Sequence, residues 1–496
     1  MKGNMDANQL SRKLAYSALT FFFCYLFTLV LIFGMTIVND LSDWQGYLQA
    51  HTSETLSLVV SIFFLYAIVY FYFLFEDRNA LLKVQNILLV FTLIISSMLI
   101  CYVFGRFIHI YSRPVAMFAI LAFFLINRRH ALFLNFIFGF LLFILDLCTN
   151  TFPVSELNSE IYSSFLLTFL SGTFAVFFAG RVKTRGNLLL TGIFIAVPTV
   201  IVVLLFNIPE ITNWILYVSD AGFRLLGCIL SAILALALMP IYEGIFNRLT
   251  VFRLRELTST DAALLVRLKK EANGTFNHSL IVAQLAEACA VAIGENAEIA
   301  RTAAYYHDVG KLKDPLCFTE NQTDYNLHDE ITPELSADII RSHTKNGYDL
   351  LIANHLPRAI ADVALQHHGT LPIKYFYDKA IRYSGDADLR DFTYLGPVPQ
   401  SKIAAIIMIA DAVEAATRAL GDRSPAKVEK ICRSIIEERM DLGQFDECDI
   451  TLRELTIIKR ALVDALSGVH HHRVQYPAIQ FNRNREAVSI DEGRNG

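Results

Sequence analysis

The sequence predicts an all-α protein in two parts, a polytopic bundle of membrane-spanning helices followed by an all-helical soluble domain. The chain of 496 residues is 54% hydrophobic and has a mean hydropathy of +0.43, which is too apolar for an ordinary soluble enzyme. Long apolar runs are confined to about residues 14–244, whereas the sequence after Arg248 has a soluble composition with helical spacing of apolar residues. We therefore expect a transmembrane region at 1–247, a soluble domain at 248–478 and a disordered tail at 479–496.

Eight apolar runs in the first part are predicted to be helical spans, and most are long enough to cross about 30 Å of hydrocarbon. They lie at residues 14–38, 56–75, 84–104, 114–126, 131–147, 162–179, 188–206 and 225–243. The fourth and fifth runs are short and closely spaced, so they form either a tight helical hairpin or one re-entrant unit. The first run is longer than the apolar core of a signal peptide and has no small-residue cleavage site, so we expect it to be retained.

The basic residues of the short loops predict the orientation of the bundle. Most of them lie in the N-terminus and in the second, fourth and sixth loops: Lys2, Arg12, Lys13, Arg78, Lys83, Arg128, Arg129, Arg181, Lys183 and Arg185. The loops at 39–55, 148–161 and 207–223 contain no Lys or Arg, and only Arg106 and Arg113 in the third loop break the pattern. The N-terminus and the soluble domain are therefore predicted to be cytoplasmic.

Charged and thiol residues exclude several other classes of protein. Asp146, Arg224 and Glu243 lie near span ends, so we expect them to reach the headgroups rather than to form an ion pathway. The net charge of −4 lacks the basic surplus of a DNA- or RNA-binding protein. Eight scattered cysteines without a CxxC pair indicate buried thiols, not a zinc ribbon or a disulfide framework.

The helical pattern of the soluble domain carries a set of imidazole and carboxylate side chains. Seven are candidate metal ligands: His278, His307, Asp308, His343, His367, His368 and Asp411. Imidazole and carboxylate suit Mn, Fe or Zn, and seven ligands are too many for one ion but suit two. The adjacent pairs His307-Asp308 and His367-His368 are expected at helix ends, where consecutive side chains can converge, and Asp308 can bridge two metals.

Each candidate also has a structural interpretation. An isolated His278 or His343 is more often a hydrogen-bonded core histidine than a ligand, and the His367-His368 pair alone fits a polar helix terminus. Asp411, in contrast, lies in an apolar run where an unpaired carboxylate would be costly to bury. The seven residues together favour a metal site. The remaining histidines at 328, 355 and 470–472 are interpreted as surface residues.

Several motifs of the soluble domain resemble a known family. HD followed by GK, with an upstream histidine, later histidines and an aspartate, is similar to the HD-domain metal-dependent phosphohydrolases. The segments AYYHDVGKLKDP, SADIIRSHTKNG, QHHGTLPIKYFY, FTYLGPVPQSK and ADAVEAATR resemble more closely the seven-transmembrane HD receptors, the PgpH-type cyclic di-AMP phosphodiesterases of bacteria. The similarity covers roughly residues 248–477, and the preceding helices also fit.

Two features depart from the family pattern. Family members usually carry a large extracellular domain between the first and second helices, where this chain has only residues 39–55, so sensing by such a domain is not expected. The family also tends to show two consecutive histidines where this chain has Asn277-His278. The ligand histidine is kept, so we expect altered support of that ligand with catalysis retained.

The resemblance implies two divalent transition-metal ions, Mn or Fe. It assigns His278, His307, Asp308 and Asp411 to one ion, and Asp308, His343, His367 and His368 to the other. The implied reaction is hydrolysis of cyclic di-AMP to linear pApA at the bacterial inner membrane, with the lipid bilayer as a partner and a second copy of the chain as a further candidate partner.

Substrate contacts are expected from cations and aromatic rings. Lys311, one turn after Asp308, can reach a phosphate oxygen and assist catalysis, and Arg418 is a second candidate, although both also fit exposed salt-bridging cations. Several aromatic residues offer rings on which a purine can stack, and we expect only one or two of them to touch the base: Tyr305, Tyr306, Tyr375, Phe376, Tyr377 and Tyr394, with Tyr375 and Tyr377 favoured.

Three other functions are weighed against cyclic di-AMP hydrolysis. Cyclic di-GMP enzymes typically follow their paired histidines with Glu and Gly-Tyr-Pro, whereas Gly369 and Thr370 follow here. Alarmone hydrolases use an HDxxxED pattern that this chain lacks. A membrane receptor whose HD domain only binds nucleotide is the third alternative, and it would not need all seven ligands.

Overall fold

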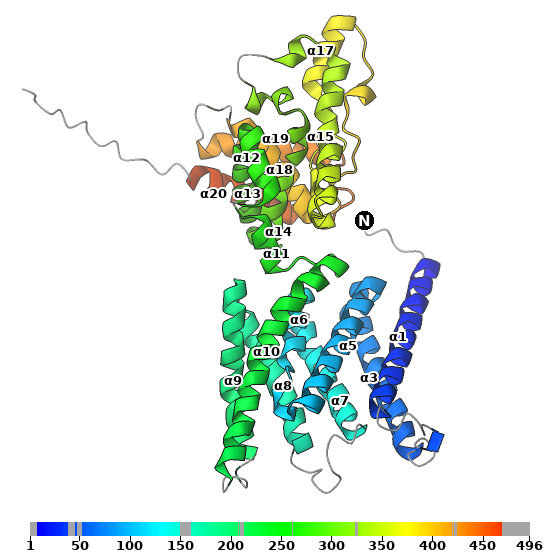
Figure 1. The fold of residues 1–496 in the computed structure, drawn as a ribbon. Helices are drawn as coiled ribbons and strands as arrows, with labels where there is room; N and C mark the ends of the chain where they lie inside the picture. Colours follow the sequence, from blue (N-terminus) through cyan, green and yellow to red (C-terminus); the bar gives the residue numbers. More distant parts are fainter. Residues whose placement is uncertain are drawn as a thin grey trace, which may run out of the picture.

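The computed structural model describes residues 7–37, 45–46, 52–148, 160–206, 208, 213–259, 261–322, 326–418, 420 and 424–468. These residues fold as α-helices and short 3-10 helices without a strand, and their one β-bridge joins Pro372 to Thr393. A bundle of long helices and a second group of shorter helices are stacked end to end (Figure 1). The all-helical prediction is confirmed. The histidines at 470–472 and the tail at 479–496 lie outside the described residues.

The bundle contains long helices and two short ones. Its helices are α1 (Ala7–Thr36), α3 (Thr52–Glu76), α4 (Arg78–Leu81), α5 (Val84–Phe107), α6 (Ala116–Leu125), α7 (Arg128–Cys148), α8 (Glu160–Ala179), α9 (Arg185–Phe206) and α10 (Trp214–Phe246). In the described part of the chain, all of these except α4 and α6 are long and apolar enough to cross a membrane. The chain is therefore a multi-pass membrane protein.

The fourth predicted span is shorter than expected. Helix α6 has 10 residues, which extend only about 15 Å at about 1.5 Å per residue. Most of its side chains are buried, and α7, α8 and α10 pack around it. The other helix that meets the length and hydropathy criteria is α13 (Asn273–Ile293), but α13 packs on helices of the soluble domain. Its apolar residues therefore build a soluble core.

Three charged side chains of the bundle are more deeply buried than the sequence analysis predicted. The side chains of Asp146, Arg224 and Glu243 are each only 2 or 3% exposed, so the prediction that they reach the headgroups is wrong. Asp146 accepts a hydrogen bond of 2.8 Å from Arg113 Nη1. Arg224 donates to Ser171 Oγ. Partners inside the bundle thus replace water, which lowers the cost of burying these groups.

The soluble domain is built from ten α-helices among the described residues. They are α11 (Val251–Leu257), α12 (Ala263–Glu271), α13, α14 (Ala297–Tyr306), α15 (Pro333–Ala353), α16 (Arg358–Gln366), α17 (Lys374–Ser384), α18 (Lys402–Arg418), α19 (Pro425–Asp441) and α20 (Leu452–Gly468), with α17 lying apart at the distal end (Figure 1). Helix α18 is the central element, because its apolar run from 404 to 410 is buried and it contacts α13, α14, α16 and α19. This packing brings the ends of α14 and α16 beside the middle of α18.

Candidate metal centre

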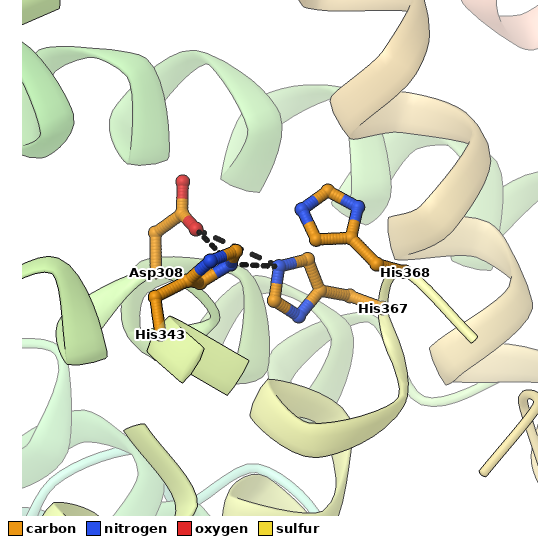
Figure 2. Close-up of side chains that lie close together, drawn as sticks. All are labelled: Asp308, His343, His367 and His368. Atoms are coloured by element: carbon orange, nitrogen blue, oxygen red, sulfur yellow. Dashed lines mark hydrogen bonds and ion pairs between the residues drawn. The ribbon is translucent and has the colours of Figure 1, made fainter. Parts of the chain in front are cut away.

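Seven side chains that can bind metal meet in the centre of the soluble domain. One group consists of Asp308, His343, His367 and His368, and the other consists of His278, His307 and Asp411. Within each group the ligand atoms lie within 4.8 Å of one another. Figure 2 shows the first group, with the imidazoles of His343 and His367 directed at Asp308. The structure thus brings together all seven predicted candidates.

Asp308 lies between the two groups. Its Oδ1 is 3.3 Å from His343 Nε2 and 3.5 Å from His367 Nε2. Its Oδ2 is 3.3 Å from His307 Nε2 and 3.7 Å from His278 Nε2. Each oxygen of one carboxylate therefore faces a different pair of imidazoles, which is the arrangement needed to bridge two cations.

Asp411 completes the second group from the opposite side. Its Oδ1 is 2.9 Å from His278 Nε2 and 3.8 Å from His307 Nε2, and its Oδ2 is 3.9 Å from His368 Nδ1. The carboxylate lies in the buried run of α18, where the sequence predicted that it needs a partner.

Both adjacent pairs occur where helices end, as predicted. Helix α14 ends at Tyr306, and His307 is its C-cap, while Asp308 has φ −104° and ψ 12° outside the α-helix. His367 is likewise the C-cap of α16. Because the backbone leaves the helical path at these residues, consecutive side chains can point into the same space.

A glycine allows His343 to approach Asp308. Gly310 lies in the short 3-10 helix η5 (Val309–Lys313), and a Cβ on it would lie 1.9 Å from His343 O and 2.4 Å from Gly347 N. Any side chain at position 310 would therefore push α15 away. The glycine of the HDVGK motif thus has a packing function, because it permits the close contact that positions His343.

The backbone orients three of the imidazoles. The Nδ1 atoms of His307, His343 and His367 donate to the carbonyl oxygens of the residues three positions earlier, at 2.7, 2.5 and 2.9 Å. Because Nδ1 is engaged by the backbone, Nε2 is directed at the site, where it can bind a metal once it is unprotonated.

Glu414 supports the fourth imidazole, and the sequence analysis missed it. His278 Nδ1 donates to Glu414 Oε2 at 2.6 Å, and the Arg418 guanidinium donates to Glu414 at 2.8 Å. Glu414 lies three residues after Asp411, on the same face of α18. That spacing was the available signal. Arg418 is thus anchored to a group that supports His278.

The electrostatics keep several ligands in their binding forms. Burial alone would raise the pKa of Asp308, but the attraction of Lys311 and His307 holds it well below its usual range. Burial and the neighbouring imidazoles lower the pKa of His367 to about 4 and hold that of His368 well below its usual range. Metal ligands must be ionised carboxylates or neutral imidazoles, so these three residues are prepared for a cation.

His307 behaves differently from the other imidazoles. Burial would lower its pKa, but the Coulombic attraction of Asp308 and hydrogen bonds to Asp308 and Asp411 outweigh this and raise its pKa to about 10. The carboxylates thus attract positive charge to this position, which a metal ion can supply instead of a proton.

Two buried atoms test whether a metal ion fits the site. His307 Nε2 and Asp308 Oδ1 are buried and make no hydrogen bond within the described part of the chain. Such groups are costly to leave unpaired. A divalent cation in each group would satisfy both, so the residues present fit two metal ions.

A cleft of about 420 Å³ opens onto both groups. It is lined by His278, Asp308, His368, Asp411, Lys311, Glu320 and Arg418, among others. Lys311 Nζ lies 2.7 Å from Asp308 Oδ2 and 2.8 Å from Glu320 Oε1, which fixes the ammonium in the wall of the cleft. Both predicted cationic contacts, Lys311 and Arg418, therefore face the space where a substrate can enter.

The two favoured aromatic candidates lie away from the cleft, whereas Tyr394 lies beside the metal ligands. Tyr375 and Tyr377 belong to α17 and are not among the residues that line the cleft. Tyr375 is 68% exposed, and the Tyr377 ring packs against Phe392 at 5.8 Å. Tyr394, in contrast, stacks on His368 with ring centroids 4.4 Å apart.

The histidines interpreted as surface residues divide in the structure. His355 is exposed, as predicted. His328 is only 4% exposed, donates from Nε2 to Cys317 O at 2.8 Å and packs against Phe376. The surface prediction for His328 is wrong, because the hydrogen bond to Cys317 O and the contact with Phe376 hold its ring in the interior.

The comparisons with known proteins match both parts of the chain. The family model described as 7TM receptor with intracellular HD hydrolase matches residues 53–250, and the HD domain model matches residues 275–416. The Cyclic-di-AMP phosphodiesterase PgpH of Bacillus subtilis (strain 168) is 37% identical over 463 residues, which cover 88% of this chain and 64% of that protein. PgpH of Listeria monocytogenes is 43% identical over 312 residues, covering 62% of this chain and 43% of that protein.

The chain thus spans between two fifths and two thirds of the length of these curated relatives. Among solved structures, the L. monocytogenes PgpH HD domain in complex with cyclic-di-AMP is 49% identical, with a TM-score of 0.41. That match covers 43% of this chain and 99% of the crystallised chain.

Proposed function

Because this chain belongs to the family of seven-transmembrane receptors with an intracellular HD hydrolase, we propose that it is a membrane-bound phosphodiesterase that hydrolyses cyclic di-AMP to linear pApA. The observation that carries the proposal is the position of Asp308, whose two oxygens face two separate groups of imidazoles. Two curated relatives bear the name Cyclic-di-AMP phosphodiesterase PgpH, which supports the choice of substrate.

The seven ligands would hold two divalent transition-metal ions, Mn or Fe. His278, His307, Asp308 and Asp411 would hold one ion, and Asp308, His343, His367 and His368 the other; the His-rich carboxylate set suits both metals. Two such ions would neutralise a phosphodiester and lower the pKa of a water molecule toward about 7. The deprotonated water would attack phosphorus in line while the bond from phosphorus to the ribose 3′-oxygen breaks, so that this oxygen leaves and one ring opening gives pApA.

The side chains around the ions would bind and orient the substrate. Lys311 is held between two carboxylates at the cleft wall, where its ammonium can donate to a phosphate oxygen next to the metals. Arg418 lines the same cleft and is half-exposed, so its guanidinium is accessible to the second phosphate of a cyclic dinucleotide. Base stacking on Tyr375 or Tyr377 stays a prediction.

We place the chain in the bacterial inner membrane, with its N-terminus and HD domain in the cytoplasm. The loops between α3 and α5, α6 and α7, and α8 and α9 lie at the end of the bundle that faces the HD domain (Figure 1). These loops carry the Lys and Arg residues of the second, fourth and sixth predicted loops, and basic loops favour the cytoplasm. A homodimer stays a prediction.

The test is product analysis with the purified full chain. Protein loaded with Mn²⁺ or anaerobic Fe²⁺ is given cyclic di-AMP and cyclic di-GMP in parallel, and the products are separated by chromatography. We expect pApA to form selectively. Preferential cleavage of cyclic di-GMP would overturn the assignment of cyclic di-AMP as the substrate. If folded, metal-loaded protein hydrolyses neither dinucleotide, the assignment as an enzyme is overturned and a nucleotide-binding receptor is favoured.

A further inference from the structure

A second cavity lies in the membrane bundle, at the end nearest the HD domain. It measures about 260 Å³ and is enclosed by α1, α3, α4, α5, the turn between α6 and α7, and the residue Arg248 that follows α10. Its polar side includes Asp77, Lys83, Asn86, His130 and Arg248. No residue of the metal centre contributes to it.

The polar side of this cavity carries more positive than negative charge. Lys83 and Arg248 contribute two cations, and among the described residues that line the cavity Asp77 is the only carboxylate. Asp77 is already engaged, because its Oδ1 accepts from Ala80 N at 2.9 Å and its Oδ2 lies 3.4 Å from His130 Nε2. An anion can therefore enter without displacing a strong ion pair.

Two further features favour an anionic group with oxygen acceptors. Arg248 donates from Nη2 to Asn86 Oδ1, but its Nε is buried and has no hydrogen-bond partner within the described part of the chain. Helix α5 begins beside the cavity at Val84, and Lys83 provides no side-chain cap. Its first-turn amides and dipole add positive potential, as at phosphate sites.

Apolar crevices continue from the polar cavity along the bundle. One crevice of about 210 Å³ lies between α1 and α3 and is lined by aromatic side chains with Ala18 and Ala67. A narrower one lies between α1, α3, α5 and α7. Phe21 lines the polar cavity and both crevices. The combined space is therefore polar at the HD-facing end and apolar toward the middle of the bundle.

We propose that this space binds an anionic phospholipid, with the phosphate headgroup between Lys83 and Arg248 and an acyl chain in the crevice between α1 and α3. A free phosphate would satisfy the cations but leave the crevice unfilled, whereas a lipid fills both. Basic pockets between transmembrane helices are a recognised form of lipid-headgroup site. The proposal is independent of the reaction assigned to the HD domain.

The lipid would contact the connection between the two parts of the chain. Arg248 N donates to Glu243 O at 3.0 Å at the end of α10. Arg253 donates to the same carbonyl at 3.1 Å and to His355 O of the soluble domain at 3.0 Å. A headgroup held by Arg248 therefore lies next to the hydrogen bonds that join the bundle to the HD domain.

Native mass spectrometry of the detergent-solubilised full chain tests the proposal. The protein is titrated with phosphatidylglycerol and phosphatidylcholine of identical acyl chains, with and without inorganic phosphate as competitor. The variant Lys83→Gln/Arg248→Gln removes both cations. Its matched control is Arg181→Gln/Lys183→Gln, which removes two cations from the loop between α8 and α9, outside the cavity. Ala67→Phe fills the crevice and leaves the cations in place.

We expect wild type and control to bind phosphatidylglycerol at least about tenfold more tightly than phosphatidylcholine. A tenfold difference in affinity corresponds to about one charge-assisted hydrogen bond. Lys83→Gln/Arg248→Gln should lose this preference, and Ala67→Phe should weaken retention of both lipids. An equal preference for phosphatidylglycerol in Lys83→Gln/Arg248→Gln and in the control would overturn the proposal. Complete displacement by inorganic phosphate, with no effect of Ala67→Phe, would assign the cavity to a free anion instead.

Discussion

At the scale of single residues, Asp308 can serve two groups of imidazoles because its two oxygens face in different directions. Its two oxygens point to different pairs of Nε2 atoms at 3.3–3.7 Å, and Lys311 keeps it ionised. The surrounding imidazoles are held by backbone carbonyls, and His278 is held by Glu414. The ligand geometry therefore depends on groups that do not themselves face the metals.

Glu414→Gln tests this dependence. The amide cannot balance the charge that develops on His278 when it binds a cation, so we expect metal affinity to fall by about 10- to 100-fold. Metal retained after dialysis against a graded chelator series measures the loss. Glu437→Gln, at an exposed position of α19, is the control and should match wild type. Unchanged retention in Glu414→Gln would show that His278 needs no such support.

The pKa of His307 predicts the pH dependence of metal binding. Its value in the metal-free protein is raised from 6.5 to about 10, so the imidazole is protonated at pH 8 and must release a proton when it binds a metal. Affinity should therefore rise by about tenfold per pH unit for each proton released, up to about pH 10. Calorimetry in two buffers of different ionisation enthalpy counts the protons. No proton release between pH 7 and 9 would contradict this account.

The residues of the site differ in how well the sequence identifies them. The ligand candidates could be predicted because seven imidazole and carboxylate side chains in one helical domain, with Asp411 in an apolar run, are hard to explain otherwise. Glu414 could not be identified from the sequence, because a glutamate on a helix is more often an exposed residue or part of a surface ion pair. Stacking of a base on Tyr375 or Tyr377 stays a prediction, because an aromatic ring also suits packing such as that of Tyr377 beside Phe392.

At the scale of elements, the close contact of η5 with α15 positions His343. Gly310→Ala would place a methyl group 1.9 Å from His343 O, so we expect a loss of about 1–3 kcal/mol in the free energy of unfolding and weaker metal binding. Thermal unfolding and metal content of the full chain measure both effects. Gly244→Ala, where nothing lies within 4 Å of the added methyl, is the matched control. Wild-type metal content in Gly310→Ala would argue against this packing function.

Helical periodicity predicted most elements, but hydropathy alone could not assign them to the membrane. Helix α13 is as long and apolar as a span, yet it carries His278 and packs in the soluble domain. Helix α6 is apolar but has only 10 residues, which is too short to cross a membrane. Neighbouring helices of the bundle cover its apolar side chains. Burial inside protein and burial in lipid select similar residues, so the hydropathy of one helix does not separate them. The composition of the surrounding sequence placed α13 in the soluble domain, and the packing confirms this.

At the scale of the whole molecule, the stability of the bundle depends on buried charged side chains that were expected to reach the headgroups. Asp146→Asn would leave the Arg113 guanidinium buried without its counter-charge, and we expect a loss of about 3–5 kcal/mol in stability. Thermal unfolding of the full chain in detergent measures it. Glu271→Gln breaks the exposed pair with Arg267 and should cost less than about 1 kcal/mol. Equal effects of the two variants would contradict the importance of the buried pair.

The helix bundle and the HD domain are stacked end to end (Figure 1). The metal centre lies in the HD domain, and residues at the HD-facing end of the bundle line a polar cavity. The basic residues of the loops could predict which end of the bundle lies on the same side of the membrane as the soluble domain. The contacts that join the parts, such as Arg253 with His355 O, could not be predicted, because a basic residue after a span has no sequence pattern that identifies its partner.

The central claim is that Asp308 joins two metal ions that act together on cyclic di-AMP. The most direct test is the initial rate of pApA formation by the full chain as Mn²⁺ is added in measured equivalents, with Asp308→Asn as the comparison. We predict that the rate reaches its plateau at two Mn²⁺ per chain and that Asp308→Asn loses more than about 100-fold in rate, beyond the effect of groups that only support a ligand. A plateau at one Mn²⁺, or an Asp308→Asn variant as fast as wild type, would contradict the claim.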